Sequence, residues 1–388
     1  MKKYDFDKIV ERRGSNCYKW DDAPAGVIPM WIADMDFETA PFVIEALHKR
    51  VEHGIFGYTK VPDSYYDAVV NWFKNRHGWS HLQKDWILYT SGVVPALSVV
   101  IKAFTQPGDQ VIVQTPVYNC FFSSIRNNGC EIVENKLIYN EHNYQMDFDD
   151  LERKAADPKA KLLLLCNPHN PAGRVWTRQE LQRLGDICIR HNVLVVSDEI
   201  HCEFVFPGHQ YVPFASISDE LQHHSITCNA PSKAFNTAGL QIANIISDTP
   251  DYRQKIDRAI NINEVCDVNP FGVVALQAAY TEDGADWLQQ LNEYLYANYT
   301  YLKEYFEYEI PQFPITQLEG TYLAWVDCSV LPLTSEQIAE HLKTHFLVQV
   351  NEGSMYGDDR FIRINLACPR QRLEEGLKRI VKGLQDLL

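Results

Sequence analysis

The fold is decided by residues 161–197, which begin with KLLLLC (161–166) and end with NVLVVS (192–197). Both runs are almost entirely apolar and about one strand long, and the first stops at the turn-forming pair Asn167-Pro168. Thr177 is followed three residues later by Glu180, a capping-box pattern, so a helix is expected over Thr177–His191. Apolar strands separated by a helix are typical of a parallel sheet that is covered on both faces.

The alternation of strands and helices continues on both sides of this stretch. Further strands are expected at 86–90, 110–114 and 225–229, and a helix at about 94–104. The pattern then changes to a long helix at 285–308, and shorter elements follow at 321–326, 335–346, 361–367 and 371–387. We therefore predict an N-terminal arm, or part of the small domain, at 1–50, a large α/β domain at 51–283 and a smaller α+β domain at 284–388.

Composition excludes several classes of partner. The net charge of −15 argues against nucleic acids and anionic membranes as partners. No apolar run approaches the ~20 residues that a membrane span needs, and the charged start of the chain does not fit a signal peptide. The ten cysteines are scattered without a Cys-x-x-Cys pair, which favours free thiols in a reducing compartment. We expect a cytoplasmic protein.

Polar residues gather after the ends of the predicted strands, where open α/β sheets bind ligands. They are Ser91-Gly92, Tyr118, Asn170, Asp198 and Ser232-Lys233. Each one alone has an ordinary interpretation: Lys233 as a solvated lysine, Asp198 as a helix cap, and Asn170 and Tyr118 as loop residues. The backbone N–H groups that open a helix after Gly92 could hold an anion, although most such turns bind nothing.

Their order along the chain is more specific than any one of them. Gly92-Val93-Val94, Tyr118, Asn170-Pro171, Asp198-Glu199 and Ser232-Lys233 together resemble the fold-type I, aminotransferase class I/II family of pyridoxal phosphate (PLP) enzymes. The resemblance covers essentially the whole chain and implies the PLP-dependent transferase fold with PLP as the cofactor. It implies that Lys233 forms an imine with PLP, that Asp198 holds the pyridine nitrogen protonated, and that Tyr118 stacks on the ring and takes part in catalysis. Asn170 would hold the ring hydroxyl, and Val93, Val94 and Ser232 the phosphate.

Further motifs resemble the MalY/PatB branch of this family, which consists of cystathionine β-lyases, also called carbon–sulfur lyases. They are WIADMDF (31–37), NPHNP (167–171), SDEIH (197–201), RIN (363–365) and ACPR (367–370). The resemblance implies that Arg363, backbone at Ala33 and Asn170 bind the substrate. It also implies a homodimer in which Tyr58 reaches the phosphate of the neighbouring subunit.

Three positions depart from the class I aminotransferase pattern. His201 stands where those enzymes carry a tyrosine, and its imidazole could still donate to the ring oxygen. Gln241 replaces an arginine that faces the phosphate, and Ala230 replaces a serine. A phosphate pocket with less positive charge is therefore expected.

The function implied by the resemblance is α,β-elimination of cystathionine or related cysteine S-conjugates to a thiol, pyruvate and ammonia. An aminotransferase uses the same lysine, aspartate and arginine and is the first alternative. A PLP-fold protein that mainly binds a regulatory partner is the second. No metal site is expected, because His201-Cys202-Glu203 and His223-His224 lack the spacing of known sites.

Overall fold

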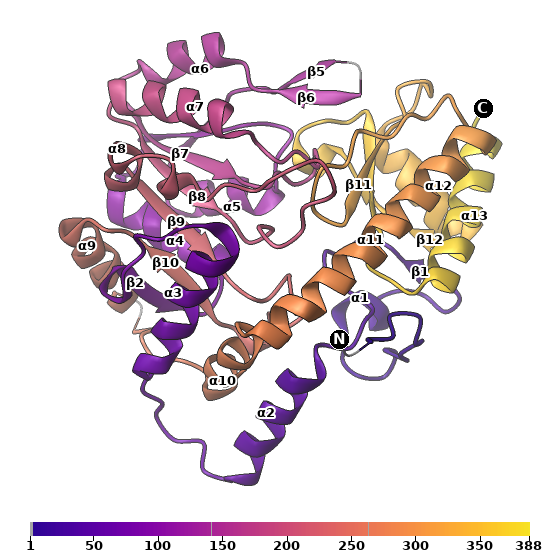
Figure 1. Ribbon diagram of the computed structural model, residues 1–388. Coiled ribbons are helices and arrows are strands. Elements are labelled where there is room, and N and C mark those ends of the chain that lie inside the picture. Colours follow the sequence, from indigo (N-terminus) through magenta and orange to yellow (C-terminus); the bar gives the residue numbers. More distant parts are fainter. Residues whose placement is uncertain (1–2, 141, 263) are drawn as a thin grey trace.

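The computed structural model describes residues 3–140, 142–262 and 264–388, and its core is one seven-stranded sheet (Figure 1). The strands follow one another across the sheet as β2 (Ile87–Thr90), β10 (Ala243–Ile246), β9 (Ser225–Asn229), β8 (Leu194–Asp198), β7 (Ala160–Cys166), β3 (Gln110–Val113) and β4 (Glu131–Glu134). All neighbours from β9 to β4 pair in parallel, whereas β10 is antiparallel to both β9 and β2. The predicted mostly parallel, mixed sheet is thus present.

The run KLLLLC lies in the middle of this sheet and is buried on both sides. Leu162 and Leu164 face a core formed with α4 (Val93–Phe104), α5 (Asn119–Asn127) and α9 (Pro250–Asn261). Leu163 and Leu165 face the opposite core, formed with α6 (Phe148–Ala155), α7 (Arg178–Arg190) and α8 (Asp219–His223). Since burying a leucine contributes about 1.5–3 kcal/mol, this alternation fixes the strand between two helical layers.

Local signals placed the ends of several elements correctly. Thr177 caps α7, and its side chain and that of Glu180 form the expected reciprocal capping box. The strand at 225–229 and the helix at 335–346 begin and end as predicted. The strand predicted at 192–197 is shifted, because β8 runs to Asp198 and this carboxylate belongs to the last residue of the strand.

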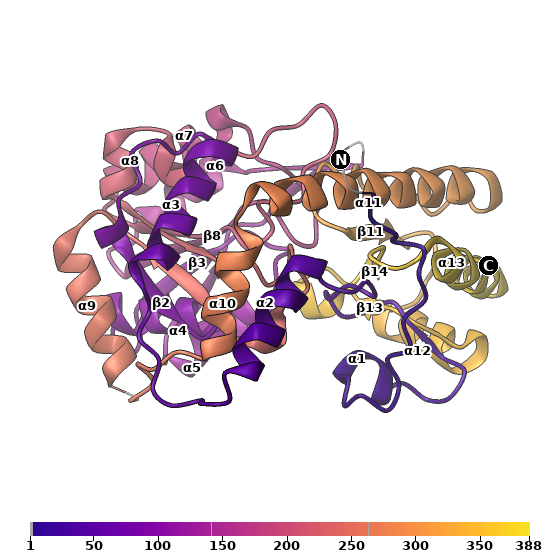
Figure 2. The same cartoon turned by 60° about the horizontal axis from the view of Figure 1, so that its bottom comes forward.

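A smaller α+β unit lies at the C-terminal end of the chain. Its antiparallel sheet consists of β11 (Leu323–Asp327), β14 (Phe361–Asn365) and β13 (Asn351–Glu352), and its helices are α12 (Ser335–Phe346) and α13 (Arg370–Asp386). The long helix α11 (Glu282–Glu309) runs from the large sheet to this unit (Figure 2). The exact domain boundaries stay a prediction.

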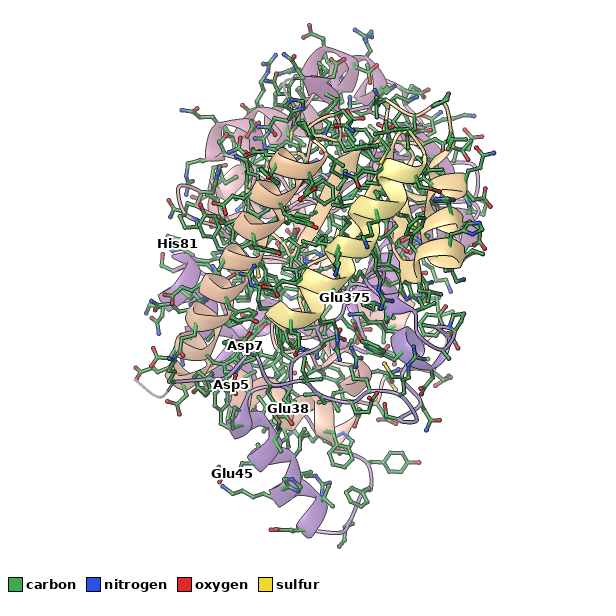
Figure 3. All side chains as sticks on the ribbon, turned by 90° about the vertical axis from the view of Figure 1, so that its right-hand side faces the viewer. Asp5, Asp7, Glu38, Glu45, His81 and Glu375 are labelled. Atoms are coloured by element: carbon green, nitrogen blue, oxygen red, sulfur yellow. The ribbon has the colours of Figure 1, made fainter. Side chains whose placement is uncertain are left out.

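The N-terminal region contacts both parts of the molecule. Strand β1 (Ile28–Pro29) pairs in parallel with β12 (Val348–Gln349) of the small unit. Helix α2 (Pro41–Glu52) instead packs against α10 (Pro270–Ala279), which also contacts α3 (Asp63–His77). Figure 3 shows Asp5 and Asp7 of the arm near Glu38, and Tyr294 on α11 donates a hydrogen bond to Asp7.

The remaining elements are short. They are α1 (Tyr18–Asp21), the paired strands β5 (Ile138–Asn140) and β6 (Asn143–Gln145), and the 3-10 turns η1 (Lys84–Trp86), η2 (Phe214–Ser216), η3 (Ala238–Leu240) and η4 (Ser354–Tyr356). Within the described ranges, no helix combines the length and the apolar character needed to cross a bilayer.

Candidate active site

A cavity of about 190 Å³ opens at the carboxyl ends of β7, β8 and β9. Its position follows from the sheet, because parallel strands end along one edge and the segments that leave them meet there. Most of the predicted site residues line it: Ala33, Val93, Val94, Tyr118, Asn170, Asp198, His201, Ser232 and Lys233. The strand-end residues from Ser91 to Lys233 therefore meet in one place, as their pattern predicted, and Ala33 joins them from the N-terminal region.

Lys233 lies in the turn after β9, and its amine donates a hydrogen bond to the carbonyl oxygen of Ala33 at 2.5 Å. The side chain reaches the cavity, so the residue is partly exposed, but the surrounding protein removes most water from the amine. This burial, with a smaller contribution from the Arg363 cation, lowers the pKa of Lys233 to about 8. An amine with such a pKa can accept and return protons near neutral pH.

Asp198 ends β8 and is buried beside Lys233. Its Oδ1 accepts a hydrogen bond from the backbone N–H of Ile200 at 3.2 Å. Burial raises the pKa of Asp198 to about 7, and the Ile200 N–H and the Lys233 charge oppose that shift only partly. A cationic ring nitrogen placed against this carboxylate would favour its ionised form, which is the pairing that a protonated pyridine requires.

The N-terminus of α4 offers an anion site on the cavity wall. Gly92 is the N-cap residue and no side chain caps the helix, so the N–H groups of Val93 and Val94 are available to a ligand. Ser91, Ser232 and Gln241 line the same cavity. Among the lining residues that the structure describes, Lys233 is the only lysine or arginine, so N–H groups and hydroxyls rather than cations face an anion here.

Arg363 lies on β14 of the small unit and is 2% exposed. Its Nη1 donates to Asn170 Oδ1 at 3.1 Å, and its Nη2 donates to the carbonyl oxygen of Trp31 at 2.8 Å. Its Nε is buried without a partner in the described part of the chain. A buried guanidinium with a free donor is suited to a carboxylate ligand, because it can donate two parallel hydrogen bonds.

His201 and Tyr118 supply two more ligand-facing groups. His201 Nδ1 is buried and lacks a hydrogen-bond partner among the described residues. Burial, and then the Lys233 and Arg363 charges, hold the pKa of His201 well below its ordinary value, so the imidazole is neutral. Burial also raises the pKa of the Tyr118 hydroxyl, which stays protonated. Buried polar atoms without a partner in the described part of the chain, such as His201 Nδ1 and Arg363 Nε, are suited to a polar ligand at this site.

Tyr322 contributes to this site, although nothing in the sequence singled it out. It directly precedes β11, is fully buried, and donates a hydrogen bond from its hydroxyl to the Ala33 carbonyl at 3.1 Å. From the sequence, only a strand at 321–326 is predicted around this residue. Its proximity to Lys233 depends on how the small unit packs against the large sheet, which residue spacing does not encode.

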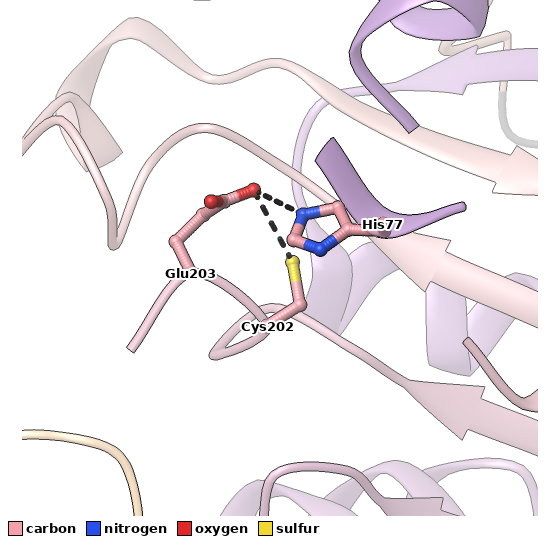
Figure 4. Close-up of side chains that lie close together, drawn as sticks. All are labelled: His77, Cys202 and Glu203. Atoms are coloured by element: carbon pink, nitrogen blue, oxygen red, sulfur yellow. Dashed lines mark hydrogen bonds and ion pairs between the residues drawn. The ribbon is translucent and has the colours of Figure 1, made fainter. Parts of the chain in front are cut away.

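A cluster of His77, Cys202 and Glu203 lies outside the cavity, and the ligand atoms of the three residues lie within 4.8 Å of one another (Figure 4). Glu203 accepts hydrogen bonds from Trp72 Nε1 at 2.7 Å and Arg76 Nε at 2.5 Å, and its Oε1 lies 2.8 Å from His77 Nε2. The Glu203 carboxylate that a metal ion would need is therefore already paired with Arg76, which is permanently charged. These contacts join α3 to the turn that carries His201.

We expect Glu203→Gln to destabilise the protein by about 1.5–3 kcal/mol, because it weakens the charge-assisted hydrogen bonds that the buried carboxylate accepts, while Arg76 itself stays partly exposed. Neighbouring charges lower the pKa of Glu203 to about 2 despite its burial. The stabilisation is therefore fully present above about pH 4.5 and is lost as the pH falls towards 2. Urea unfolding at pH 7 measures the destabilisation, and urea unfolding at pH 3 measures its loss as the carboxylate is protonated.

The control is Glu307→Gln, which removes an exposed ion pair with Lys303 on α11. Such pairs contribute at most about 1 kcal/mol. Equal destabilisation by both substitutions, or a Glu203→Gln effect that grows as the pH falls, would contradict the assignment.

A larger cavity of about 610 Å³ lies between α11 and the loops near 206–209 and 311–318. None of the predicted site residues lines it. Most of the residues that are predicted to bind the cofactor and the substrate thus line the smaller cavity at the strand ends.

Comparison with known proteins identifies relatives over nearly the full chain. A sequence model of the family "Aminotransferase class I and II" matches residues 25–380. Cystathionine beta-lyase PatB of Bacillus subtilis is 41% identical over 98% of this chain and 99% of that protein, and protein MalY of Escherichia coli is 32% identical over 98% and 99%. The crystal structure of cystalysin from Treponema denticola, which contains a pyridoxal 5'-phosphate cofactor, superposes with a TM-score of 0.96 at 37% identity and covers 100% of both chains.

Proposed function

The chain belongs to the aminotransferase class I and II family, and we propose that within this family it is a PLP-dependent carbon–sulfur β-lyase. The observation that supports PLP chemistry is the cavity that joins Lys233, Asp198 and Asn170, with Arg363 bound to that asparagine. Identity of 41% with a cystathionine β-lyase along nearly the whole chain favours lyase activity over transamination. The substrate class is L-cystathionine and related cysteine S-conjugates.

The cavity fits PLP at each of its functional groups. The free N–H groups of Val93 and Val94, with Ser232, suit the phosphate, and Asp198 suits the pyridine nitrogen. Asn170 and His201 would hold the ring oxygen, Tyr118 would cover the ring face, and Lys233 would attach the cofactor; all four residues line the cavity. When bound, PLP serves as an electron sink that stabilises negative charge at the substrate α-carbon.

The chain's own residues carry out binding and proton transfer. Arg363, together with backbone at Ala33, binds the substrate carboxylate and thereby orients the α-carbon. Lys233, with its pKa lowered to about 8, takes the α-proton. The bond between the β-carbon and sulfur then breaks, and the sulfur leaves with the electron pair as a thiol or thiolate. Hydrolysis of the remaining three-carbon fragment yields pyruvate and ammonia.

The test is incubation of the purified protein with L-cystathionine, with and without a 2-oxo acid. We expect equimolar pyruvate and homocysteine without the oxo acid. Turnover that requires the oxo acid and yields a new amino acid would identify an aminotransferase. Absence of both pyruvate and thiol would overturn the lyase proposal.

We propose further that the working unit is a homodimer. The loop after α2 exposes Ile55, Phe56 and Tyr58, and Ile262 and Val265 are exposed as well, each more than half accessible. Figure 1 shows α2 and this loop projecting from the rest of the molecule. Three exposed apolar side chains within one projecting loop are typical of a surface that a second protein covers. Tyr58 is 97% exposed and does not line the cavity of its own chain, which suits a role in the partner's site.

We expect Tyr58→Phe to weaken PLP binding about 10- to 100-fold, because a hydrogen bond to a charged group contributes about 1.5–3 kcal/mol. Fluorescence titration of the cofactor-free protein measures this affinity, and analytical ultracentrifugation checks that the dimer persists. Tyr308→Phe, at an equally exposed tyrosine near the end of α11, serves as the control. Unchanged PLP affinity in Tyr58→Phe, or a monomer in the wild-type sample, would contradict the shared site.

A further inference from the structure

The backbone at 31–35 crosses the active site, and side chains from distant parts of the chain hold its carbonyl groups. Arg363 and Asn351 donate to Trp31, and Asn365 donates to the carbonyls of Ile32 and Asp34 at 2.6 and 2.7 Å. Met35 accepts a hydrogen bond from Asn236 at 2.8 Å. We call residues 31–35 the active-site strap. These hydrogen bonds hold the strap on both sides of Ala33 and leave the Ala33 carbonyl oxygen to other donors.

Two donors share the Ala33 carbonyl oxygen. The Lys233 amine lies 2.5 Å from it and the Tyr322 hydroxyl 3.1 Å. A carbonyl oxygen has two lone pairs, so both hydrogen bonds can form together. The Tyr322 hydroxyl and the catalytic amine are therefore linked through one shared oxygen atom, although Tyr322 does not line the cavity itself.

The ring of Tyr322 is held rigidly. It packs edge-on against Phe204 at 4.8 Å between ring centroids and against His201 at 6.0 Å. Its backbone carbonyl accepts a hydrogen bond from the Leu366 N–H at 2.9 Å. Burial raises the pKa of the hydroxyl, so it remains a donor across the working range. A donor fixed in this way can hold the carbonyl, and through it the amine.

We propose that Tyr322 is a positioning residue for Lys233 and acts through the Ala33 carbonyl. When the lysine amine is not attached to the cofactor, one of its N–H groups donates a hydrogen bond to that oxygen. This hydrogen bond directs the nitrogen lone pair towards the substrate α-carbon. The amine then forms an N–H bond as the α-carbon–hydrogen bond breaks, and the carbon retains the electron pair. The inference rests on the proton-transfer role proposed for Lys233, not on cleavage of a carbon–sulfur bond.

The test is Tyr322→Phe, which removes one oxygen atom and keeps the ring. Exchange of the α-hydrogen of L-alanine in D₂O, followed by proton NMR, reports proton transfer alone, because alanine has no β-leaving group. We expect kcat for exchange to fall about tenfold, the effect of one lost hydrogen bond, while KM changes less than twofold. The rate at which cofactor-free protein takes up PLP, followed by visible absorbance, should fall as well, because it depends on the same free amine.

Tyr65→Phe is the matched control. Tyr65 is also fully buried, its hydroxyl donates to Asn244 at 2.6 Å, and it does not line the cavity. Both variants lose one buried hydrogen bond, so rates are compared per folded site, counted by cofactor bound at saturation. A positioning role slows exchange and cofactor uptake only in Tyr322→Phe. Equal rates in the two variants, or wild-type rates in Tyr322→Phe, would overturn the inference.

The outcomes also separate this inference from the proposed function. Wild-type protein that exchanges alanine but releases no pyruvate from cystathionine would refute the lyase and leave the Tyr322 comparison valid. Protein that cleaves cystathionine normally with either tyrosine or phenylalanine at 322 would refute the positioning role alone.

Discussion

Lys233→Ala is expected to lower pyruvate release from L-cystathionine by about 10⁴-fold or more, because one side chain both attaches the cofactor and moves the α-proton. The visible absorbance of attached PLP should disappear in the same variant. The rate of pyruvate formation and the absorption spectrum, measured on the same sample, test both roles. A small primary amine added to the solution should restore part of the proton transfer, since it can reach the space that the side chain vacates.

Lys255→Ala is the control for this substitution. Lys255 is half exposed on α9 and pairs with Asp251 four residues earlier, so its loss should leave turnover unchanged. Retention of more than a tenth of the activity by Lys233→Ala would contradict the assignment. A cellular phenotype that survives the loss of activity would instead favour a partner-binding role for the fold.

Asp198→Asn is expected to lower kcat/KM by about 10²- to 10³-fold, because removing one member of a buried charge pair costs about 3–5 kcal/mol. The amide cannot hold a proton on the pyridine nitrogen, so negative charge at the α-carbon loses its stabilisation. Steady-state kinetics with cystathionine measure the loss. Alanine exchange should fall with it, because the same charge develops in that reaction.

Glu199→Gln provides a closely matched control. Glu199 is adjacent, equally buried, and also has its pKa raised to about 7 by burial. Its carboxylate accepts hydrogen bonds from Ser197, Tyr211 and the Phe214 N–H, and it does not line the cavity. We expect reduced stability and less than a tenfold change in kcat/KM. Similar kinetic losses at 198 and 199 would show that Asp198 has no specific role.

Much of the large sheet could be predicted because its signals are local. KLLLLC alternates between two cores, and Thr177 with Glu180 defines a helix start within four residues. The strand-end residues of the site were predictable for the same reason, since the carboxyl ends of parallel strands meet at one edge. Assigning a role to each of them required the resemblance to a known family.

The remaining features depend on contacts between distant segments. Arg363 meets Asn170 across 193 residues and Trp31 across 332, a proximity that spacing alone does not reveal. Adjacency in sequence likewise does not show where the side chains of His201-Cys202-Glu203 point. His201 lines the cavity, whereas Cys202 and Glu203 meet His77 of α3, because successive residues of the turn point in different directions.

The active-site strap has a consequence for how the enzyme forms. Lys233 and Ala33 are 200 residues apart, and Tyr322 and Ala33 are 289 apart, so these hydrogen bonds close very long loops. Contacts of this kind form slowly and late in folding, after the local helices and strands. During refolding, catalytic competence should therefore return after the secondary structure, and a chain truncated before the small unit would keep Lys233 and Asp198 yet lack both Tyr322 and Arg363. Synthesis of the last quarter of the chain is thus the point at which the nascent protein first becomes able to act as an enzyme.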